Sequence, residues 1–490
     1  MPDRPSSSSR LTDAQQRSVQ QLFGTAPVVD ELGTLFTDAG HSLYLVGGSV
    51  RDALLGELGH DLDFTTSARP DEIERLLRTR TSTIWTVGRE FGTIGGRIGD
   101  WQIEITTFRA DAYAADSRKP AVEFGDNLSG DLIRRDFTVN AMALSLPDHA
   151  FVDPYGGVDD LIEQRLRTPT APEVSFTDDP LRMLRAARFA ARLGLVPTPE
   201  LVAAMTELAD RLSIVSAERI SDEFAKLLLT DHPRIGLDLL VRTGLADQFL
   251  PELPALRLER DEHHRHKDVY VHSLIVLEQA IDLERIRGHQ PDLVNRLAAL
   301  LHDIGKPRTR KFEAGGKVTF HHHDVVGAKM ARKRLKALRF SSEQIDAVAQ
   351  LIELHLRFHG YSDTAGDGEG GWTDSAVRRY VRDAGDQLER LHMLTRADCT
   401  TRNQAKATRL RRAYDELEWR IDELAKQEEL DAMRPDLDGN QIMQILGIQP
   451  GRQVGEAYKH LLELRIDNGP LGHERAEAEL RTWWAAQPHD

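Results

Sequence analysis

The sequence predicts a multidomain α+β protein in which a mixed α/β domain is followed by an all-α remainder. Short strand-like apolar runs, such as LYLV and WQIEITTF, occur from Leu43 to about Val152, with helical segments such as 70–78 between them. From about Val158 onward strand signals nearly vanish, and apolar residues recur at helical spacing in LRMLRAARFAARLGL and ISDEFAKLLL. The chain of 490 residues is long enough for about three domains.

Three stretches of the sequence indicate joints or loops between these parts. They are 250–254, the Gly/Asp-rich run GYSDTAGDGEGGW, and Arg434-Pro435. Together with the motifs described below, they predict five parts: a disordered leader at 1–20, a head at 21–160, a helical neck and body at 161–255, a histidine-rich domain at 256–400 and a helical tail at 401–490.

The composition excludes several classes of protein. Hydrophobic residues make up 40% of the chain and charged residues 29%, which is typical of soluble globular proteins. No apolar run approaches the roughly 20 residues needed to cross a bilayer, so we expect no membrane association. The opening MPDRPSSSSR lacks the apolar stretch of a signal peptide. Cys399 is the only cysteine, which excludes intrachain disulfides and cysteine zinc sites and predicts a cytoplasmic location.

The net charge of the chain disfavours non-specific binding to nucleic acid. Lys and Arg total 63 against 78 Asp and Glu, a net charge of −15, which argues against general adhesion to a polyanion. RNA would have to bind local basic patches. Such patches occur at Arg134-Arg135, among the arginines of 182–192 and from Arg332 to Lys336. Each also fits an ordinary solvated helix face.

The first candidate site lies in the segment LYLVGGSVRDALLGELGHDLDFTT, residues 43–66. Because side chains alternate along a strand, Asp61 and Asp63 point to one face while Leu62 points to the core. Two adjacent carboxylates repel each other unless one is protonated or a cation lies between them. Oxygen ligands favour Mg²⁺, with a nucleoside triphosphate completing its coordination. The pattern therefore predicts metal-dependent nucleotidyl transfer.

Residues on either side of this Asp-x-Asp pair extend the predicted site. Gly47 and Gly48 let backbone N–H groups approach phosphate oxygens, and Arg51 offers a guanidinium to the same phosphates. Glu104, on WQIEITTF, is a candidate third carboxylate. Taken singly, the glycines also fit a plain turn and the aspartates a solvated strand end.

A second cluster opens with Arg134, Arg135 and Asp136, where the polarity of the chain falls sharply toward FTVNAMAL. It is a candidate contact with the triphosphate or the primer end. The alternative is a surface ion pair, which would add little stability.

The third cluster, DDPLRMLRAARF, offers a way to select a base. Pro180 suits the first position of a helix that Asp179 could cap, and Arg182, Arg185 and Arg188 then follow at three-residue steps. Cytosine and adenine present an exocyclic donor beside a ring acceptor, so a carboxylate next to a guanidinium matches them and clashes with uracil and guanine. A mismatch that leaves buried polar groups unpaired can discriminate by on the order of 10⁴-fold. Side chains alone could thus select CTP and ATP.

With these motifs in order, the chain resembles the class II tRNA nucleotidyltransferases, the CCA-adding family related to bacterial poly(A) polymerases. GGSVRD, DLD, ITTFR, RRDFTVNAMA, DPYGG and DxLRxxRAxRF carry the resemblance from Leu43 to Phe189. Asp178 stands where relatives often carry Glu. The resemblance implies these roles: nucleotide contacts from Gly47, Gly48, Arg51 and Asp136, Mg²⁺ ligation by Asp61 and Asp63, phosphate or primer binding by Arg135, base reading by Asp179 and Arg182, and triphosphate or ribose contacts from Arg185 and Arg188.

The implied reaction is attack of an RNA 3′-hydroxyl on the α-phosphorus of CTP or ATP, with pyrophosphate leaving. Two Mg²⁺ ions about 4 Å apart would stabilise the entering and leaving oxygens.

Histidines are concentrated in one part of the chain, where eleven of the 19 lie between His263 and His359. Within it, the order H, HD, H, H, D resembles the HD metal-dependent phosphohydrolase superfamily, whose ligands come from separate helices. The implied ligands are His272, His302, Asp303, His323, His355 and Asp398. Imidazole and carboxylate suit Mn²⁺, Co²⁺, Ni²⁺ or Fe²⁺ better than Mg²⁺ alone. Any single histidine also fits a surface or core position, and His321, His322 and His359 are left unassigned.

The preferred function is therefore template-free addition and repair of the 3′-terminal CCA of tRNA, with a second HD phosphohydrolase activity on RNA ends. One alternative is a poly(A) polymerase, which a long basic tail would favour, whereas this chain ends in WWAAQPHD. The alternative of another class is a tRNA-binding scaffold with hydrolase activity only. The sequence leaves open whether the chain adds all of CCA or only C or A, and its oligomeric state.

Overall fold

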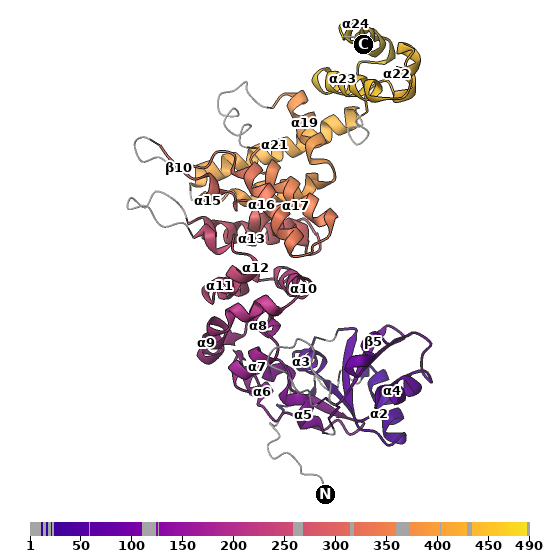
Figure 1. Ribbon diagram of the computed structural model, residues 1–490, viewed down its shortest axis with the longest axis vertical. Coiled ribbons are helices and arrows are strands. Elements are labelled where there is room, and N and C mark those ends of the chain that lie inside the picture. The colour runs from indigo at the N-terminus through magenta and orange to yellow at the C-terminus, as the bar shows by residue number, and fades with distance from the viewer. Residues whose placement is uncertain are drawn as a thin grey trace. The chain divides into compact units, whose positions relative to one another are not determined.

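The computed structural model divides into two compact units, residues 1–254 and 255–490 (Figure 1). The boundary falls at the joint predicted over 250–254. The structure describes residues 11–12, 16–17, 21, 24–57, 59–109, 124–125, 127–257, 268–313, 318–358, 372–401, 403–428 and 434–487. Most of the predicted leader, the Gly/Asp-rich run as far as Gly371, and His359 lie outside these residues. The finer division into five parts stays a prediction.

The first unit contains a mixed seven-stranded sheet with strand order β3-β4-β5-β2-β1-β6-β7. Its strands are β1 Leu43–Val46, β2 Asp61–Thr66, β3 Ile84–Trp85, β4 Thr93–Ile98, β5 Trp101–Thr107, β6 Ala143–Leu146 and β7 Phe151–Val152. Strands β2 and β5 are parallel, and every other neighbouring pair is antiparallel. The apolar runs of the sequence coincide with β1, β2, β4 and β5, whereas β3 and β6 were not predicted.

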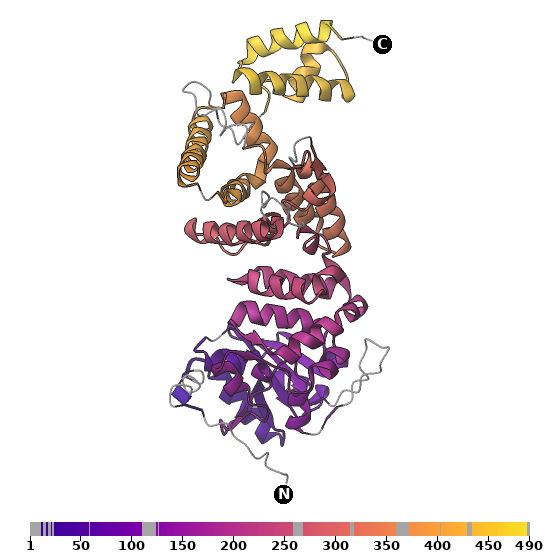
Figure 2. The same ribbon diagram turned by 90° about the vertical axis from the view of Figure 1, so that its left-hand side faces the viewer.

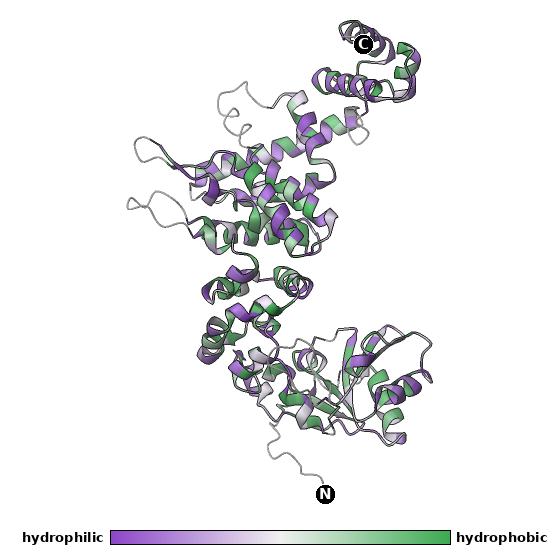
Figure 3. Cartoon of the chain, viewed as in Figure 1, coloured by the Kyte–Doolittle hydropathy of each residue, from purple (hydrophilic) through white to green (hydrophobic). Residues whose placement is uncertain are grey.

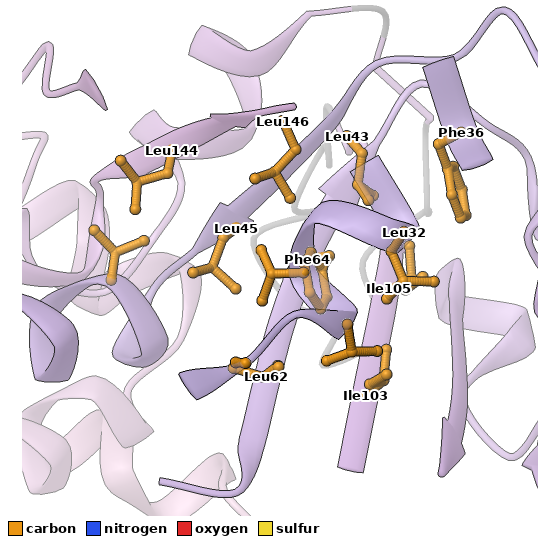
Figure 4. Close-up of a cluster of buried hydrophobic side chains, with 14 of the residues drawn as sticks. Leu32, Phe36, Leu43, Leu45, Leu62, Phe64, Ile103, Ile105, Leu144 and Leu146 are labelled. Carbon is orange, nitrogen blue, oxygen red and sulfur yellow. The ribbon is translucent and has the colours of Figure 1, made fainter. Parts of the chain in front are cut away.

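Helices cover this sheet and bury its apolar face. They are α2 Val28–Asp38, α3 Gly48–Leu54, α4 Pro70–Leu77, α5 Leu128–Ile133 and α6 Gly157–Ile162, with the 3₁₀ turns η1 Arg89–Phe91 and η2 Thr138–Asn140. Figure 4 shows Leu32 and Phe36 of α2 facing Leu43 of β1 and Phe64 of β2 in one cluster. Hydrophobic residues recur along the strands (Figure 3). Each fully buried side chain of this size contributes about 1.5–3 kcal/mol, so the cluster fixes which face of β2 remains open.

The rest of the first unit is helical, apart from the short parallel pair β8 Arg165–Leu166 and β9 Val196–Pro197. Its helices are α7 Pro172–Asp178, α8 Leu181–Leu193, α9 Pro199–Glu207, η3 Ala209–Ile214, α10 Ala217–Leu228, α11 Pro233–Arg242 and α12 Leu245–Phe249, and η4 Pro254–Leu256 crosses the unit boundary. Helix α8 packs against α10 and α11. A Cβ at Gly236 would lie 2.5 Å from the Ala187 carbonyl oxygen, so α11 approaches α8 with backbone nearly in contact.

The second unit is also helical, as predicted, with one short hairpin. It contains α13 Val269–Ile286, α14 Leu293–Leu301, α15 Lys306–Thr309, β10 Lys311–Phe312, β11 Val318–Thr319, α16 His323–Ala337, α17 Ser342–Leu354, α19 Asp374–Ala384, η5 Gly385–Gln387, α20 Leu388–Asp398 and α21 Gln404–Glu428. Helix α21 belongs to the predicted tail, yet it packs on α19 and α20. Tyr414 of α21 donates a hydrogen bond to the Thr395 carbonyl at 2.8 Å and stacks on Phe358.

The last three helices, α22 Gly439–Leu446, α23 Arg452–Asn468 and α24 His473–Ala485, pack around a small core of their own. Figure 2 shows them in yellow as one group. Among the described residues, no helix combines the length and apolar character that a membrane span requires.

Candidate functional site

The three carboxylates predicted for the head lie on one face of the sheet. Strands β2 and β5 are parallel neighbours, and Asp63 pairs directly with Glu104 while Asp61 pairs with Gln102. Paired residues project to the same face of a sheet, as do residues two apart in one strand. Asp61 and Asp63 are exposed and Glu104 is half-buried, whereas Leu62 between the two aspartates is buried. Strand register therefore places Asp61, Asp63 and Glu104, the carboxylate site, side by side.

The electrostatics of the carboxylate site favour a cation. Desolvation by the surrounding protein and the charge of Asp61 raise the pKa of Asp63, although its side chain keeps contact with solvent and Arg135 acts in the opposite sense. Burial, followed by the charges of Asp63 and Asp61, raises the pKa of Glu104. Asp63 and Glu104 thus ionise less readily than free carboxylic acids, and a divalent ion with oxygen ligands would remove that cost.

The turn before α3 ties the glycine motif to these carboxylates. Gly47 has φ +68°, a conformation that favours glycine. A Cβ there would lie 2.8 Å from Arg135 Nη1 and 4.0 Å from Asp63 Oδ2, so Arg135 lies beside the carboxylate site. Ser49 accepts a hydrogen bond from the Asp63 backbone N–H at 3.0 Å and donates one to the Asp61 carbonyl at 3.3 Å. Ser49 was not predicted, although it follows the glycines directly in GGSVRD.

Arg51 faces protein partners instead of an open surface. Its side chain is buried, and its Nε and Nη2 lie 2.8 and 2.7 Å from Asp52 Oδ1. Its Nη1 donates to Asn140 Oδ1 at 2.5 Å, and the guanidinium carbon lies 5.3 Å from the centroid of the Phe189 ring. Burial lowers the pKa of Arg51. A contact between Arg51 and a phosphate would therefore require the exchange of one of these partners.

Asp136 is buried and holds an arginine of α8. Its Oδ2 lies 2.8 Å from Arg185 Nη2, and its Oδ1 accepts hydrogen bonds from the Phe137 N–H and the Asn140 amide. Burial alone would raise the pKa of Asp136, but Arg185 and Asn140 outweigh it and lower the pKa. Asp136 thus serves as an anchor for Arg185. The same Asn140 bonds Arg51, so one side chain joins the two arginines through this network.

Asp179 and Arg182, the two residues predicted to read the base, bond different partners and not each other. The N-cap of α8 is Pro180, one residue after the predicted Asp179, although Asp179 Oδ1 accepts the Leu181 N–H at 3.2 Å. Its Oδ2 pairs with Arg219 of α10 at 2.9 Å. Arg182 is buried and donates to Ser175 Oγ at 2.9 Å and to the Arg134 carbonyl at 2.5 Å. The guanidinium bonded to Asp179 is therefore that of Arg219, which the sequence patterns did not indicate.

Arg188 also bonds a partner on α10. Its Nε lies 2.7 Å from Glu223 Oε2, and its guanidinium carbon lies 4.4 Å from the centroid of the Phe189 ring. Arg185 and Arg188 lie three residues apart in α8 but bond different acids. Arg185 pairs with Asp136, and Arg188 pairs with Glu223.

In the second unit, the six residues predicted as HD ligands form one cluster, the HD cluster. They come from α13, from the ends of α14, α17 and α20, and from the start of α16: His272, His302, Asp303, His323, His355 and Asp398. His302 Nε2 lies 3.3 Å from His272 Nε2, which lies 2.9 Å from Asp398 Oδ1. Segments up to 126 residues apart, from His272 to Asp398, therefore meet here.

Within the HD cluster, two sets of three residues have the spacing of metal ligands, and the two sets share one residue. The ligand atoms of His272, His302 and Asp303 lie within 4.8 Å of one another, and so do those of Asp303, His323 and His355. Asp303 belongs to both sets. Its Oδ2 lies 3.2 Å from His302 Nε2, and its Oδ1 lies 3.3 Å from His323 Nε2. Each oxygen of this carboxylate faces one set.

The backbone orients the histidines toward the centre of the cluster. The Nδ1 atoms of three histidines lie 2.9, 2.8 and 2.6 Å from backbone carbonyl oxygens, namely His302 with Ala299, His323 with Phe320 and His355 with Ile352. A carbonyl only accepts, so Nδ1 carries the proton and the Nε2 lone pair faces the cluster. The buried His323 Nε2, His355 Nε2 and Asp303 Oδ1 have no hydrogen-bond partner among the described residues. Since such buried atoms are rarely unpaired, the donor set fits a divalent metal ion.

Two further side chains contact the HD cluster without having been predicted. Lys306 Nζ lies 2.6 Å from Asp303 Oδ2, and Thr400 Oγ1 lies 3.1 Å from His272 Nδ1. Burial would raise the pKa of Asp303, but His302, His323 and Lys306 hold it well below its usual range. Burial is the main cause that lowers the pKa of His355 to about 4. Burial would also lower the pKa of His302, but Asp303 and Asp398 outweigh it and raise the pKa. Asp303 and His355 are thus in the unprotonated form that a metal requires, and a bound metal would displace the proton from His302.

Comparisons with known proteins identify the family. Residues 43–167 match the poly A polymerase head domain, residues 194–256 the probable RNA and SrmB-binding site of polymerase A, and residues 269–403 the HD domain. The chain is 32% identical over 450 residues to the A-adding tRNA nucleotidyltransferase of Deinococcus radiodurans, covering 91% of this chain and 96% of the relative. The chain belongs to the tRNA nucleotidyltransferase family.

Other members of the tRNA nucleotidyltransferase family match over different extents. The CC-adding tRNA nucleotidyltransferase of Thermus thermophilus is 32% identical, covering 89% of this chain and 93% of the relative. The CCA-adding enzyme of Levilactobacillus brevis is 42% identical, covering 44% of this chain and 53% of the relative. The Bacillus stearothermophilus CCA-adding enzyme in complex with CTP shares the fold, with TM-score 0.64, 23% identity and coverage of 97% and 98% of the two chains. The predicted family, fold class and HD domain are confirmed, and the roles of individual residues stay predictions.

Proposed function

We propose that the head adds nucleotides from CTP and ATP to the 3′ end of tRNA without a template, completing or repairing its CCA terminus. One observation carries this proposal: the register of β2 and β5 gathers Asp61, Asp63 and Glu104 beside Gly47 and Arg135. Membership of the tRNA nucleotidyltransferase family supports it and favours it over a poly(A) polymerase or an inactive scaffold.

The side chains of the head divide the work of this reaction. Asp61 and Asp63 would hold Mg²⁺, with Glu104 as a third carboxylate. When bound, Mg²⁺ would make the RNA 3′-hydroxyl a better nucleophile and stabilise the charge on the departing pyrophosphate. Arg135, with Gly47 and Gly48 at the adjoining turn, would bind phosphate. Ser49 holds the backbone on both sides of Leu62 and so fixes the direction of the two aspartates.

Helix α8 would supply the contacts to the base and the triphosphate. Asp136 presents Arg185, whose side chain is partly exposed. Base reading by Asp179 and Arg182 would require them to release Arg219 and Ser175, their present partners. We propose that the incoming cytosine or adenine edge replaces these internal bonds, because it offers the same pattern of donor and acceptor.

Extension of defined tRNAs tests the proposal. Purified protein with Mg²⁺ is incubated with tRNA that lacks its 3′ end or only its last A, each NTP is supplied alone and together, and the products are sequenced. Addition of C, C and then A is expected. Addition of A alone or of CC alone would replace the full reaction by a partial one, as the names of the two nearly full-length relatives illustrate. A long A tract or no extension would overturn the proposal.

A second function is favoured by the HD cluster. We propose that its two ligand sets, which share Asp303, would hold two divalent transition-metal ions, such as Mn²⁺, Ni²⁺ or Co²⁺, and that these ions would activate water for hydrolysis of a phosphoester. In that hydrolysis the oxygen of water forms a new bond to phosphorus, and the leaving ribose oxygen takes up a proton. The sharing of Asp303 by two ligand sets is the observation that supports two ions. The single cysteine, Cys399, is free, and we propose a reducing cytoplasm as the compartment for both activities.

Metal stoichiometry tests the HD proposal. Protein loaded with Ni²⁺ and desalted is expected to retain about two ions per chain, and His272→Ala and His355→Ala are expected to retain about one each, because each belongs to a different set. Asp303→Asn should retain neither. Retention of one ion by the unaltered chain, or unchanged retention in Asp303→Asn, would overturn the proposal of two ions held by ligand sets that share Asp303.

A further inference from the structure

A basic groove lies between α15 and α16 in the second unit. Its volume is about 440 Å³, and it is lined by Arg308, Val326, Lys329, Met330 and Lys333. Three of these five side chains are cations and none is an acid. Since the whole chain carries a net charge of −15, a concave surface lined only by cations and apolar side chains requires an explanation.

Among the residues that the structure describes, the cations of the basic groove have no counter-ions. Arg308, Lys329 and Lys333 are exposed, and no ion pair joins any of them to an acid among the described residues. Some exposed helical cations outside the groove pair with an acid one turn away, as Arg452 does with Glu456. Helix α16 contains a single acid, Asp324, which at 100° per residue lies on the side away from the groove. An ordinary solvated face would carry mixed charges, so this surface is suited to an external anion.

The helix that carries most of the basic groove begins at the HD cluster. His323 is the first residue of α16, and Val326, Met330 and Lys333 follow it by three, seven and ten positions, which places them along one stripe of the helix. A Cβ on Gly305 would lie 2.1 Å from the His323 carbonyl oxygen. The start of α15, which carries Arg308, is therefore in backbone contact with the first turn of α16. From His323 the stripe extends about 15 Å to Lys333 at 1.5 Å per residue.

We propose that the basic groove binds the sugar-phosphate backbone of a single RNA strand and leads its end to the HD cluster. This inference rests on the proposed hydrolase function and deepens it, because it makes the substrate an oligonucleotide end instead of a free mononucleotide. Lysine binds phosphate as a point charge and reads no sequence. Lys329 and Lys333 are one helical turn apart, about 6 Å along the axis. Val326 and Met330 between the cations offer apolar contact to a ribose or a base.

The experiment compares two substrates of the metal-loaded full chain. One is a short single-stranded RNA ending in a 2′,3′-cyclic phosphate, and the other is the corresponding cyclic mononucleotide. The test variant is Lys329→Gln with Lys333→Gln. The matched control is Lys406→Gln with Lys459→Gln, which changes the net charge equally at two exposed lysines outside the basic groove.

For the test variant, kcat/KM on the RNA is expected to fall by on the order of tenfold at low salt, while kcat/KM on the mononucleotide stays within about twofold. The slope of log kcat/KM against log salt concentration is expected to decrease by roughly 1.4, since each lost contact to a single strand removes about 0.7. Equal losses on both substrates, no RNA preference in the unaltered chain, or the same loss in the control would overturn the proposal.

If the unaltered chain hydrolyses neither substrate, the hydrolase function fails while the basic groove is still testable. Single-stranded RNA is then crosslinked to a photoreactive p-benzoylphenylalanine introduced at Met330. A crosslink that Lys329→Gln with Lys333→Gln weakens and the control variant does not would support RNA in the basic groove. No crosslink, or one that an acidic peptide but not RNA competes away, would overturn it.

Discussion

The carboxylate site and the HD cluster both gather acidic groups, but they do so in opposite surroundings. Asp61 and Asp63 are exposed on a sheet face and are ordered by strand register. Asp303, His302 and His355 are buried, and backbone carbonyls orient both histidines. An exposed set of ligands can admit an ion that arrives with a nucleotide, whereas a buried and pre-oriented set is suited to retain its ion. From the difference in burial we expect an exchangeable ion at the carboxylate site and a resident ion in the HD cluster.

The largest expected effect separates the two activities. Asp61→Ala is expected to lower nucleotide incorporation by on the order of 10³-fold or more, because metal ligation supplies several kcal/mol of charge stabilisation, and to leave metal retention in the HD cluster unchanged. Incorporation of labelled CTP and Ni²⁺ content are the measurements. Asp100→Ala, in the exposed turn between β4 and β5, is the control. Unchanged incorporation in Asp61→Ala would remove the carboxylate site from the reaction.

The next effect concerns the ion pair between the buried Asp136 and the partly exposed Arg185. Asp136→Asn is expected to destabilise the first unit by about 1.5–3 kcal/mol near neutral pH, because it removes the charged partner of the partly exposed Arg185. The pKa of Asp136 is lowered in the folded state, so its contribution is present above the unfolded pKa of about 3.9 and is lost as the pH falls through the lower folded pKa. Urea unfolding of both proteins at neutral and acid pH measures this.

The difference in the free energy of unfolding between Asp136→Asn and the unaltered chain should therefore become smaller at acid pH. A difference that is the same at all pH values would show that the loss comes from packing and not from charge. Asp100→Asn provides the exposed comparison.

Metal occupancy should stabilise only the unit with buried ligands. At a free Ni²⁺ concentration about 100-fold above Kd, binding is expected to add about 2.7 kcal/mol to the free energy of unfolding of the second unit. The measurement compares the Tm of chelated protein with that of the same protein reloaded with Ni²⁺, and the reloaded protein should have the higher Tm. Asp303→Asn should show no such rise, since it removes the ligand common to both sets. An equal rise in that variant would place the bound ion elsewhere.

The smallest effect tests how strand register is maintained at the carboxylate site. Ser49→Ala removes the hydroxyl that bonds the Asp63 N–H and the Asp61 carbonyl, and is expected to cost about 1 kcal/mol. We expect kcat to fall while KM for CTP changes little, because the aspartates lose their fixed direction. Ser221→Ala, whose hydroxyl bonds Glu218 in its own helix, should change neither kinetic constant. A change in KM alone would contradict the positioning role.

Local periodicity predicted those features that depend on neighbouring residues in the chain. Alternation along β2 gave the shared face of Asp61 and Asp63, and the order of histidines and aspartates anticipated a cluster that the fold assembles from several helices. Strand β6 was not recognised, because its four residues ALSL have no alternating pattern and owe their strand form to pairing with β1.

The partners of the arginines could not be predicted, because they depend on packing between helices. Arg182, Arg185 and Arg188 have the same spacing, yet the first bonds Ser175, the second Asp136 and the third Glu223. Likewise, Arg219 reaches Asp179 only because α10 packs against α8. A guanidinium with five donors forms hydrogen bonds with whichever acceptors lie near it in the folded protein. The spacing of arginines in the sequence does not indicate which acceptors these are.

The position of Asp303 in both ligand sets has a consequence for metal loading. Asp303 is already buried and held by Lys306, so a first ion would not need to order it, and the charge of that ion would oppose the arrival of a second one nearby. We therefore expect the two positions to load in separate steps, with a biphasic isotherm that becomes a simple hyperbola once either set is dismantled.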